Sequence, residues 1–479
     1  MSGPTQLLIG GKFQNARSGK TFPSINPATE EVLADVAEAD APDIDAAVKA
    51  ARAAFESNEW RLIGARERSK LLWKLGDLIM SNADELAMTE SLDNGKPIFE
   101  SRNIDIPSAA ETFYYYAGWC TKIEGETIPV PGNFFNYTLR EPYGVCGIIT
   151  PWNFPLLMVA WKLAPALACG NTAVLKVAEE TPLTGLRLGQ LCQEAGFPDG
   201  VVNVVPGFGE TAGHALVAHP DVDKISFTGS TSVGKEIVRT SAETLKKVSL
   251  ELGGKSPNIV FADSDLEAAA RGAFNGIFYG KGEVCNAGSR LFVEKSIHDK
   301  LMGRLLDRAA KLEPGDPQNP KTRLGALVSK AQMERVLHYV EIGRAEGAKP
   351  VLSGGRAGTR GYFVRPTIFD SATPSMRIAQ EEIFGPVLTV LTFEDVDELV
   401  QMANSTIYGL AAAIWTRDIA KAHKLARRIQ AGTVWINAYN MLSPESPFGG
   451  YKQSGFGREL GRCGIDLYTQ VKSVWVSLD

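Results

Sequence analysis

Cys285 is the side chain in this 479-residue sequence that is best placed for covalent chemistry. It lies in the glycine-rich run GKGEVCNAGSR, residues 280–290, where glycines allow a ligand to approach the backbone closely. Most lone cysteines are inert small hydrophobic residues, but a cysteine with a stabilised thiolate is a nucleophile. The polar loop around Cys285 favours the second interpretation. Four other cysteines lie in apolar or helical settings and are interpreted as structural: Cys120, Cys146, Cys169 and Cys192.

Two glycine turns after predicted strands could face a phosphate. Gly207, in the run PGFG, follows strand 201–205 and is one residue off the G-x-G-x-x-G dinucleotide pattern. Gly229 and Ser230 follow strand 224–227 at the start of a helical stretch, where backbone N–H groups could bind an anion. A tight strand-to-helix turn without any ligand is the alternative for both.

Lys176 ends a further predicted strand, and Glu179 follows three residues later. A carboxylate at this point can accept hydrogen bonds from ribose hydroxyls and would repel a 2′-phosphate, which favours NAD over NADP. The alternative for both residues is a solvated loop.

The elements that must position these residues have the order of a doubly wound α/β fold. Strands 145–149, 172–176, 201–205, 224–227 and 247–250 alternate with helical patterns such as 184–195 and 210–218. Strands 257–261, 290–293, 387–392, 411–415 and 433–437 predict a second α/β domain. Residues 41–100 are helical by their three- and four-residue apolar spacing, with Asp43 placed to begin the first helix. Segments 123–140 and 468–476 fit neither series and are expected to form an arm that pairs with a neighbouring subunit.

Composition excludes several classes of function. The chain has 50 basic and 55 acidic residues and no basic tract, so a nucleic acid partner is not favoured and a small molecule is. The six cysteines lack a C-x-x-C pair and the five histidines do not cluster, so we expect a reducing compartment, no disulfide framework and no metal. Prolines and Lys162 interrupt the apolar stretch 145–175, so it is expected to be buried core and not a membrane span. The N-terminus lacks a signal-peptide pattern, and a cytoplasmic location is expected.

Several motifs occur together in the order found in the aldehyde dehydrogenase superfamily: PWNFP at 151–155, FTGS at 227–230, ELGGK at 251–255, Cys285, EIFGP at 382–386 and PFGG at 447–450. The chain resembles that family from end to end. The resemblance implies a Rossmann-like NAD-binding domain (1–122 and 143–253), an α/β catalytic domain (254–446) and a small β oligomerisation arm (123–142 and 466–479).

The resemblance also implies a reaction, the NAD-dependent oxidation of an aldehyde to a carboxylic acid through a cysteine thiohemiacetal and thioester. Cys285 matches the family nucleophile, and Asn153 matches the amide that stabilises the oxyanion with the cysteine backbone N–H. Glu251 matches the base that activates water to hydrolyse the thioester. Taken alone, Glu251 would be interpreted as a capping or ion-paired carboxylate at a strand end.

Two further sets of residues are implied in the same way. Phe154, Met158 and Trp161 resemble the wall of the substrate tunnel, although such spacing by itself is more typical of core packing. The NAD site would comprise Ile149, Trp152, Lys176, Glu179, Gly207, Gly229, Ser230, Val233, Leu252, Glu382 and Phe384.

The sequence departs from the family pattern at two positions. Glu283 replaces a common Gln two residues before Cys285 and would raise the pKa of the thiol unless its carboxylate points away. Gln470 replaces a common Glu thought to help shuttle protons, so that relay is in doubt.

By the same resemblance, Asp105 falls near the mouth of the family's substrate tunnel. Its carboxylate would tolerate a cationic substrate such as betaine aldehyde.

Three alternatives to a non-acylating dehydrogenase fit the sequence less well. A CoA-acylating enzyme is disfavoured by Glu251, because a hydrolytic base would waste the acyl group. A non-catalytic protein on the same fold is disfavoured because cysteine, amide and base are all present. A cofactor-free thiol hydrolase would leave the NAD-site residues without a role. The arm segments suggest a homodimer or homotetramer.

Overall fold

The first lobe is built on a largely parallel sheet, and its central strands are the predicted apolar runs. The computed structural model describes residues 3–479 and orders this sheet β19-β11-β10-β7-β8-β9-β1-β2. Strand β7 is a continuous apolar run, as expected for a strand buried on both faces, whereas apolar and polar residues alternate in β10 and β11. The parallel strands are β7 (Val145–Ile149), β8 (Thr172–Lys176), β9 (Val202–Val204), β10 (Lys224–Thr228) and β11 (Lys247–Glu251).

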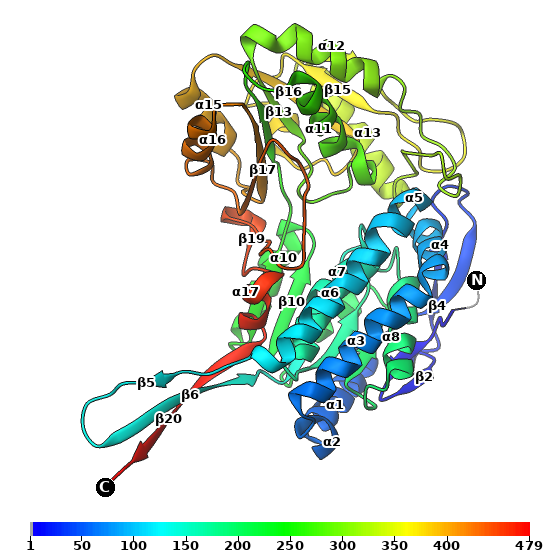
Figure 1. Ribbon diagram of the computed structural model, residues 1–479. Helices are drawn as coiled ribbons and strands as arrows, with labels where there is room; N and C mark the ends of the chain where they lie inside the picture. Colours follow the sequence, from blue (N-terminus) through cyan, green and yellow to red (C-terminus); the bar gives the residue numbers. More distant parts are fainter. Residues whose placement is uncertain (1–2) are drawn as a thin grey trace.

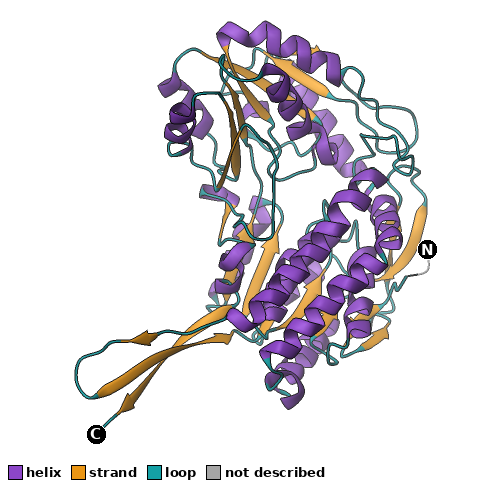
Figure 2. Ribbon diagram, in the orientation of Figure 1, coloured by secondary structure: helices purple, strands orange, loops and turns teal. Residues whose placement is uncertain are grey.

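Helices cover both faces of this sheet (Figures 1 and 2). Val145 and Ile149 of β7 pack in one core cluster with α1 (Ala41–Glu56), whereas Cys146 and Ile148 face a second cluster with α7 (Pro155–Ala168). Every residue of α7 is buried, which explains its almost wholly apolar sequence. The other main helices are α3 (Ala65–Ser81), α4 (Ala83–Asn94), α6 (Ile106–Trp119), α8 (Leu183–Ala195), α9 (His214–Ala218) and α10 (Thr231–Ala242), with short turns α2 (Asn58–Arg61) and α5 (Ile98–Glu100).

The start of α1 corrects one prediction. The N-cap is Asp40, and Asp43 stands three residues later, where its carboxylate accepts a hydrogen bond from the Asp40 N–H at 3.2 Å. Asp43 therefore stabilises the first turn from inside the helix and does not begin it.

Short antiparallel strands that the sequence pattern did not predict complete this lobe. β1 (Leu7–Ile9) pairs with β9 and with β2 (Lys12–Gln14), and β19 (Gly455–Phe456) pairs with β11 at the opposite edge. β3 (Thr21–Ile25) and β4 (Val32–Ala37) form a separate hairpin. β19 brings a C-terminal segment into the first sheet.

The second lobe contains a sheet ordered β14-β15-β16-β13-β12-β17-β18. Its strands are β12 (Pro257–Val260), β13 (Arg290–Glu294), β14 (Lys349–Leu352), β15 (Thr367–Asp370), β16 (Val387–Phe393), β17 (Ala411–Trp415) and β18 (Thr433–Ile436), all parallel except β14. The prediction missed β14 and β15. The helices are α11 (Leu266–Phe278), α12 (His298–Ala309), α13 (Lys330–Ala345), α14 (Arg377–Gln380), α15 (Val396–Asn404) and α16 (Ile419–Ala426).

A three-stranded arm projects from the first lobe and carries the C-terminus at its tip (Figure 1). It consists of β5 (Thr127–Ile128), β6 (Phe134–Pro142) and β20 (Thr469–Ser477), and β20 follows α17 (Gly461–Asp466). The two segments predicted to form an arm pair with each other. Pairing with another subunit stays a prediction.

The strand order creates a natural position for a site. The chain runs outward through β7, β8 and β9 and then reverses to β10 and β11, so the loops after β7 and β10 diverge. Open α/β sheets bind ligands in such a crevice at the carboxyl ends of the strands. No helix within residues 3–479 has both the length and the apolar character needed to cross a bilayer.

Candidate active site

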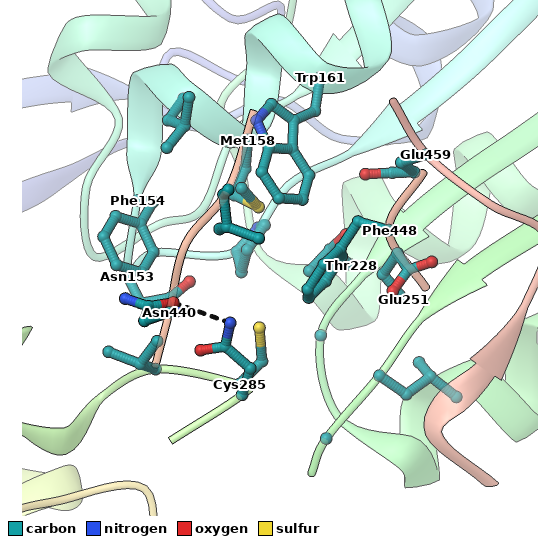
Figure 3. Close-up of a pocket in the computed structure, with 18 of the residues that line it drawn as sticks. Asn153, Phe154, Met158, Trp161, Thr228, Glu251, Cys285, Asn440, Phe448 and Glu459 are labelled. Atoms are coloured by element: carbon teal, nitrogen blue, oxygen red, sulfur yellow. Dashed lines mark hydrogen bonds between the residues drawn. The ribbon is translucent and has the colours of Figure 1, made fainter. Parts of the chain in front are cut away.

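A cavity of about 870 Å³ occupies this crevice. Asn153, Thr228 and Glu251 reach it from the carboxyl ends of β7, β10 and β11, and Cys285 reaches it from the second lobe (Figure 3). Glu382, also of the second lobe, lines the same cavity. The structure therefore brings together the three predicted catalytic residues from separate parts of the chain.

A left-handed turn delivers Cys285 to the cavity. Gly280, Lys281 and Gly282 have φ values of 56°, 64° and 75°, and a Cβ on Gly282 would lie 2.2 Å from the carbonyl oxygen of Gly385, so glycine is required there. The sulfur points into the space bounded by Met158, Phe448 and Thr228 (Figure 3). Burial, with the charges of Glu251 and Glu382, raises the pKa of the Cys285 thiol to about 12. The resting group is thus a thiol that must lose its proton before it can attack.

Asn153 lies in the loop between β7 and α7 and is almost fully buried. Its Nδ2 donates a hydrogen bond to the Glu283 carbonyl oxygen at 2.9 Å. That bond directs the nitrogen of the amide toward the Cys285 loop and leaves one N–H for another acceptor.

Glu251 ends β11 on the wall opposite Cys285, near Glu459 (Figure 3). Burial and then the charge of Glu459 raise its pKa well above the usual range for a carboxyl group. Its Oε2 is buried without a hydrogen-bond partner in residues 3–479. Gly449 makes room for this side chain, because a Cβ there would lie 2.6 Å from Oε1. Such a carboxyl group has the raised pKa of a general base for neutral pH.

Aromatic side chains form the other walls. Phe154 directly precedes α7, Met158 and Trp161 lie in its first two turns, and all three line the cavity. Trp161 meets Phe448 edge to face at 5.3 Å, and Phe154 stacks on Tyr279 at 6.3 Å between ring centroids. An apolar or aromatic group attached to the reacting carbon would fit between these rings.

The loop after β10 has the features of a binding site for a dinucleotide. Gly229 and Ser230 line the cavity at the N-terminus of α10, and the Ser230 hydroxyl accepts the Val233 N–H at 3.3 Å. Thr228 lines the cavity, and its hydroxyl is buried with no hydrogen-bond partner among the described residues. An unpartnered hydroxyl beside a helix N-terminus fits a ligand with an anionic group.

Four more predicted cofactor residues line the same cavity: Trp152, Leu252, Glu382 and Phe384. Glu382 accepts the Gly254 N–H at 2.9 Å, and burial raises its pKa to about 7. Phe384 has a positive φ of 63° and meets the Trp152 ring at 5.2 Å.

The remaining predicted cofactor residues do not line the cavity. Ile149 and Lys176 end neighbouring strands at the same sheet edge, and Lys176 Nζ donates to Glu179 Oε2 at 2.5 Å. Val233 is an exposed residue in the first turn of α10. A Cβ on Gly207 would lie 2.7 Å from the Ala39 carbonyl oxygen, so this glycine makes room for the chain itself.

The structure shows where three residues singled out from the sequence lie: Glu283, Gln470 and Asp105. The Glu283 carboxylate points away from the thiol, because it accepts the Val328 N–H at 3.0 Å and pairs with Lys281 at 2.8 Å. Gln470 is exposed on the arm, outside the residues that line the cavity. Asp105 does line the cavity, but it is fully buried and pairs with Lys96 at 2.5 Å. The expectation that Asp105 offers a free charge to a cationic substrate is therefore wrong.

Sequence reasoning missed two charged residues beside Glu251. Lys162 of α7 forms a buried ion pair with Glu459, and both charges act on Glu251. A lysine in the middle of an otherwise apolar helix was the available signal, since a buried lysine needs a partner.

Comparison with known proteins agrees with this geometry. A model described as the aldehyde dehydrogenase family matches residues 13–474. Human mitochondrial aldehyde dehydrogenase is 51% identical over 475 residues, covering 99% of this chain and 92% of that protein. The NAD+ complex of an aldehyde dehydrogenase from Bacillus cereus matches with a TM-score of 0.98 at 53% identity, covering 99% and 97% of the two chains. A variant of the P. syringae indole-3-acetaldehyde dehydrogenase, in complex with NAD+ and IAA, matches with a TM-score of 0.98 at 46% identity, covering 100% and 97%.

Proposed function

The chain belongs to the aldehyde dehydrogenase family, and we propose that it oxidises apolar and aromatic aldehydes with Cys285, Asn153 and Glu251 as its catalytic residues. The reaction converts an aldehyde to a carboxylic acid with NAD as the cofactor. The observation that carries the residue assignment is that a thiol, an amide and a carboxyl group from three separate elements line one cavity.

Each group has one task in the proposed mechanism. Cys285 releases its proton to solvent, a step that burial and the negative charge of Glu251 oppose, and Sγ then bonds to the aldehyde carbon. The free N–H of Asn153 and the backbone N–H of Cys285 donate to the oxygen as it becomes negative. NAD, when bound, supplies the hydride acceptor. Glu251 then takes a proton from water, whose oxygen adds to the thioester carbon. The C–S bond breaks, and Glu251 passes this proton to the departing Sγ, which releases the acid and restores the thiol.

The fit for NAD depends on the loop after β10. Gly229, Ser230 and the unpartnered Thr228 hydroxyl suit the pyrophosphate, and Glu382 and Phe384 suit the nicotinamide half. The predicted residues outside the cavity, Ile149, Lys176, Glu179, Gly207 and Val233, are proposed to hold the adenosine end.

The substrate class follows from the walls of the cavity. Phe154, Trp161 and Phe448 favour an apolar or aromatic group, and the similar P. syringae enzyme is named for indole-3-acetaldehyde. Betaine aldehyde or another amino aldehyde is the second candidate, because Glu111 and Glu445 are exposed carboxylates among the lining residues.

The assay follows NADH absorbance with acetaldehyde, phenylacetaldehyde and betaine aldehyde, for the wild type and Cys285→Ala. We expect phenylacetaldehyde to have the highest kcat/KM and the variant to produce no NADH. NADH production by Cys285→Ala would refute the nucleophile assignment. A preference for betaine aldehyde would refute the substrate class alone. An acyl-CoA product when CoA is added would show that the thioester is not hydrolysed.

We also propose that the arm joins copies of this chain into a dimer or a tetramer. Val471 and Trp475 are 61% and 57% exposed on β20, and an exposed apolar strand pair is typical of an interface. Light scattering of the wild type and Trp475→Lys tests this, and a monomeric wild type would refute it.

The domain limits stated above and a location in the cytoplasm are likewise proposals. The cytoplasmic location is supported by the six free cysteines.

A further inference from the structure

A closed circuit of buried polar groups lies behind the reactive loop, and most of it has no task in the mechanism above. Its side chains belong to Asn94, Lys281, Glu283 and Asn153, which are 0%, 1%, 1% and 7% exposed. Burying an amide or a charge is costly unless every group finds a partner. Two charges and two amides that are buried at this point are therefore expected to have a specific role, which their contacts reveal.

The contacts run in a ring. Asn153 Nδ2 donates to the Glu283 carbonyl oxygen at 2.9 Å, and the Glu283 carboxylate pairs with Lys281 Nζ at 2.8 Å. Lys281 Nζ also donates to Asn94 Oδ1 at 2.8 Å and to the Asn94 carbonyl oxygen at 2.9 Å. Asn94 Nδ2 donates to the Trp152 carbonyl oxygen at 2.8 Å. Because Trp152 directly precedes Asn153, the ring is closed.

One half of the ring fixes the amide of Asn153. A carbonyl oxygen can only accept a hydrogen bond, so the Glu283 carbonyl requires the nitrogen of the amide, and not its oxygen, to face the Cys285 loop. The Glu283 carboxylate is held in turn by the Val328 N–H at 3.0 Å, which keeps the backbone of residue 283 in place.

The other half of the ring fixes the turn that carries Cys285. Lys281 has a φ of +64°, a left-handed conformation that is unfavourable for a residue with a Cβ. Such strain persists only where the surrounding contacts over-determine it. The contacts of Lys281 with Asn94 and Glu283 provide that restraint four residues before the thiol.

We propose that Lys281, Glu283 and Asn94 are positioning residues, which hold the Asn153 amide and the Cys285 loop in register for stabilisation of the oxyanion. None of the three is assigned a contact with substrate. The inference rests on the proposed role of Asn153. A misplacement of about 1 Å by a group remote from the chemistry can lower a rate by roughly 100-fold.

The test is a cycle of variants, Lys281→Met, Asn153→Ala and the two combined. Active sites are counted by alkylation of Cys285, and kcat is expressed per counted site, so that loss of folded protein does not enter the result. We expect Lys281→Met to lower kcat by roughly 10- to 100-fold, with an unchanged Kd for NAD. In the Asn153→Ala background the same change should lower kcat by a clearly smaller factor, because the part that acts through the amide is already lost and only the part that acts through the Cys285 loop remains.

Two more variants separate positioning from stability. Lys281→Gln with Glu283→Gln keeps hydrogen-bonding groups but removes both buried charges, and we expect it to recover most of the kcat lost in Lys281→Met. Arg52→Met is the matched control. It breaks the Arg52–Asp223 pair (2.5 Å) at the amino end of β10, away from the cavity, and should lower Tm without changing kcat per site.

The outcomes are distinguishable. A normal kcat per site in Lys281→Met, or an equal loss in the wild-type and Asn153→Ala backgrounds, would overturn the positioning role and leave the proposed function intact. A normal kcat in Asn153→Ala would overturn the oxyanion role itself, and the positioning role with it.

Discussion

Replacing Glu459 by Gln should move the pH dependence of thioester hydrolysis toward lower pH. Burial and the charge of Glu459 raise the pKa of Glu251, and the charge of Lys162 lowers it. The variant removes the repulsive charge and leaves Lys162 without its own carboxylate partner. Both changes favour ionised Glu251, so its pKa falls and the base becomes active at lower pH.

The magnitude follows from charge interactions at short range. A neighbouring charge within a few ångströms shifts a pKa by about 1–3 units, so the acid limb of the pH profile should move by about that amount. On the acid side of the wild-type limb, each unit gives a roughly tenfold faster hydrolysis. Loss of one partner from a buried ion pair costs about 3–5 kcal/mol, and a lower Tm should accompany the shift.

An activated ester isolates this step, because it acylates Cys285 without hydride transfer and its turnover reports hydrolysis of the acyl-enzyme. The measurement is ester turnover against pH for the wild type and Glu459→Gln. Glu445→Gln is the matched control, because Glu445 is an exposed carboxylate at the same cavity. An acid limb that stays in place, or moves to higher pH, in a folded Glu459→Gln protein would refute the electrostatic reasoning.

Three further changes probe other walls of the site. Gly449→Ala places a Cβ 2.6 Å from Glu251 Oε1, so that the carboxyl group must move. The first turnover of NADH should survive while steady-state turnover falls, and loss of both in stopped flow would contradict this. Phe448→Ala opens a space beside Trp161, so kcat/KM should fall more for phenylacetaldehyde than for acetaldehyde. An equal fall for both substrates would count against the proposed binding of the substrate's aromatic ring beside Phe448. Glu179→Gln removes a charge that would repel a 2′-phosphate, so the KM for NADP should fall relative to that for NAD; an unchanged ratio would separate Glu179 from the ribose.

The predictable part of this fold is the part with strong local patterns. β7 is a short apolar run, β10 alternates polar and apolar residues, and turn residues follow both. The two strands and the loops that carry Asn153 and Gly229 could therefore be placed from sequence. β1 and β19 have only three and two residues, which is too short for any periodic pattern. Their position is decided by the sheet edges on which they pair.

The ion pairs and buried hydrogen bonds around the site could not be predicted for a different reason. Lys162 and Glu459 are separated by 297 positions, and Asn94 and Lys281 by 187, so no local pattern joins them. Sequence reasoning placed Asp105 near the mouth of the tunnel but could not foresee that it is buried in an ion pair with Lys96, which Glu90 shares. Packing in three dimensions, and not residue type, decides which charges remain free.

Because β19 pairs with β11, the first sheet can be completed only late in the synthesis of the chain. Strand β11 leaves the ribosome long before β19, and the whole second lobe is made in between. The edge of the first sheet at β11 therefore stays unpaired until residues 455–456 have been synthesised. Until then Glu251 also lacks its neighbours Gly449 and Glu459. Such contacts between distant parts of the chain are slow to form and favour intermediates. A nascent chain that stops after the second lobe would have the thiol and the amide, but not the complete surroundings of the base.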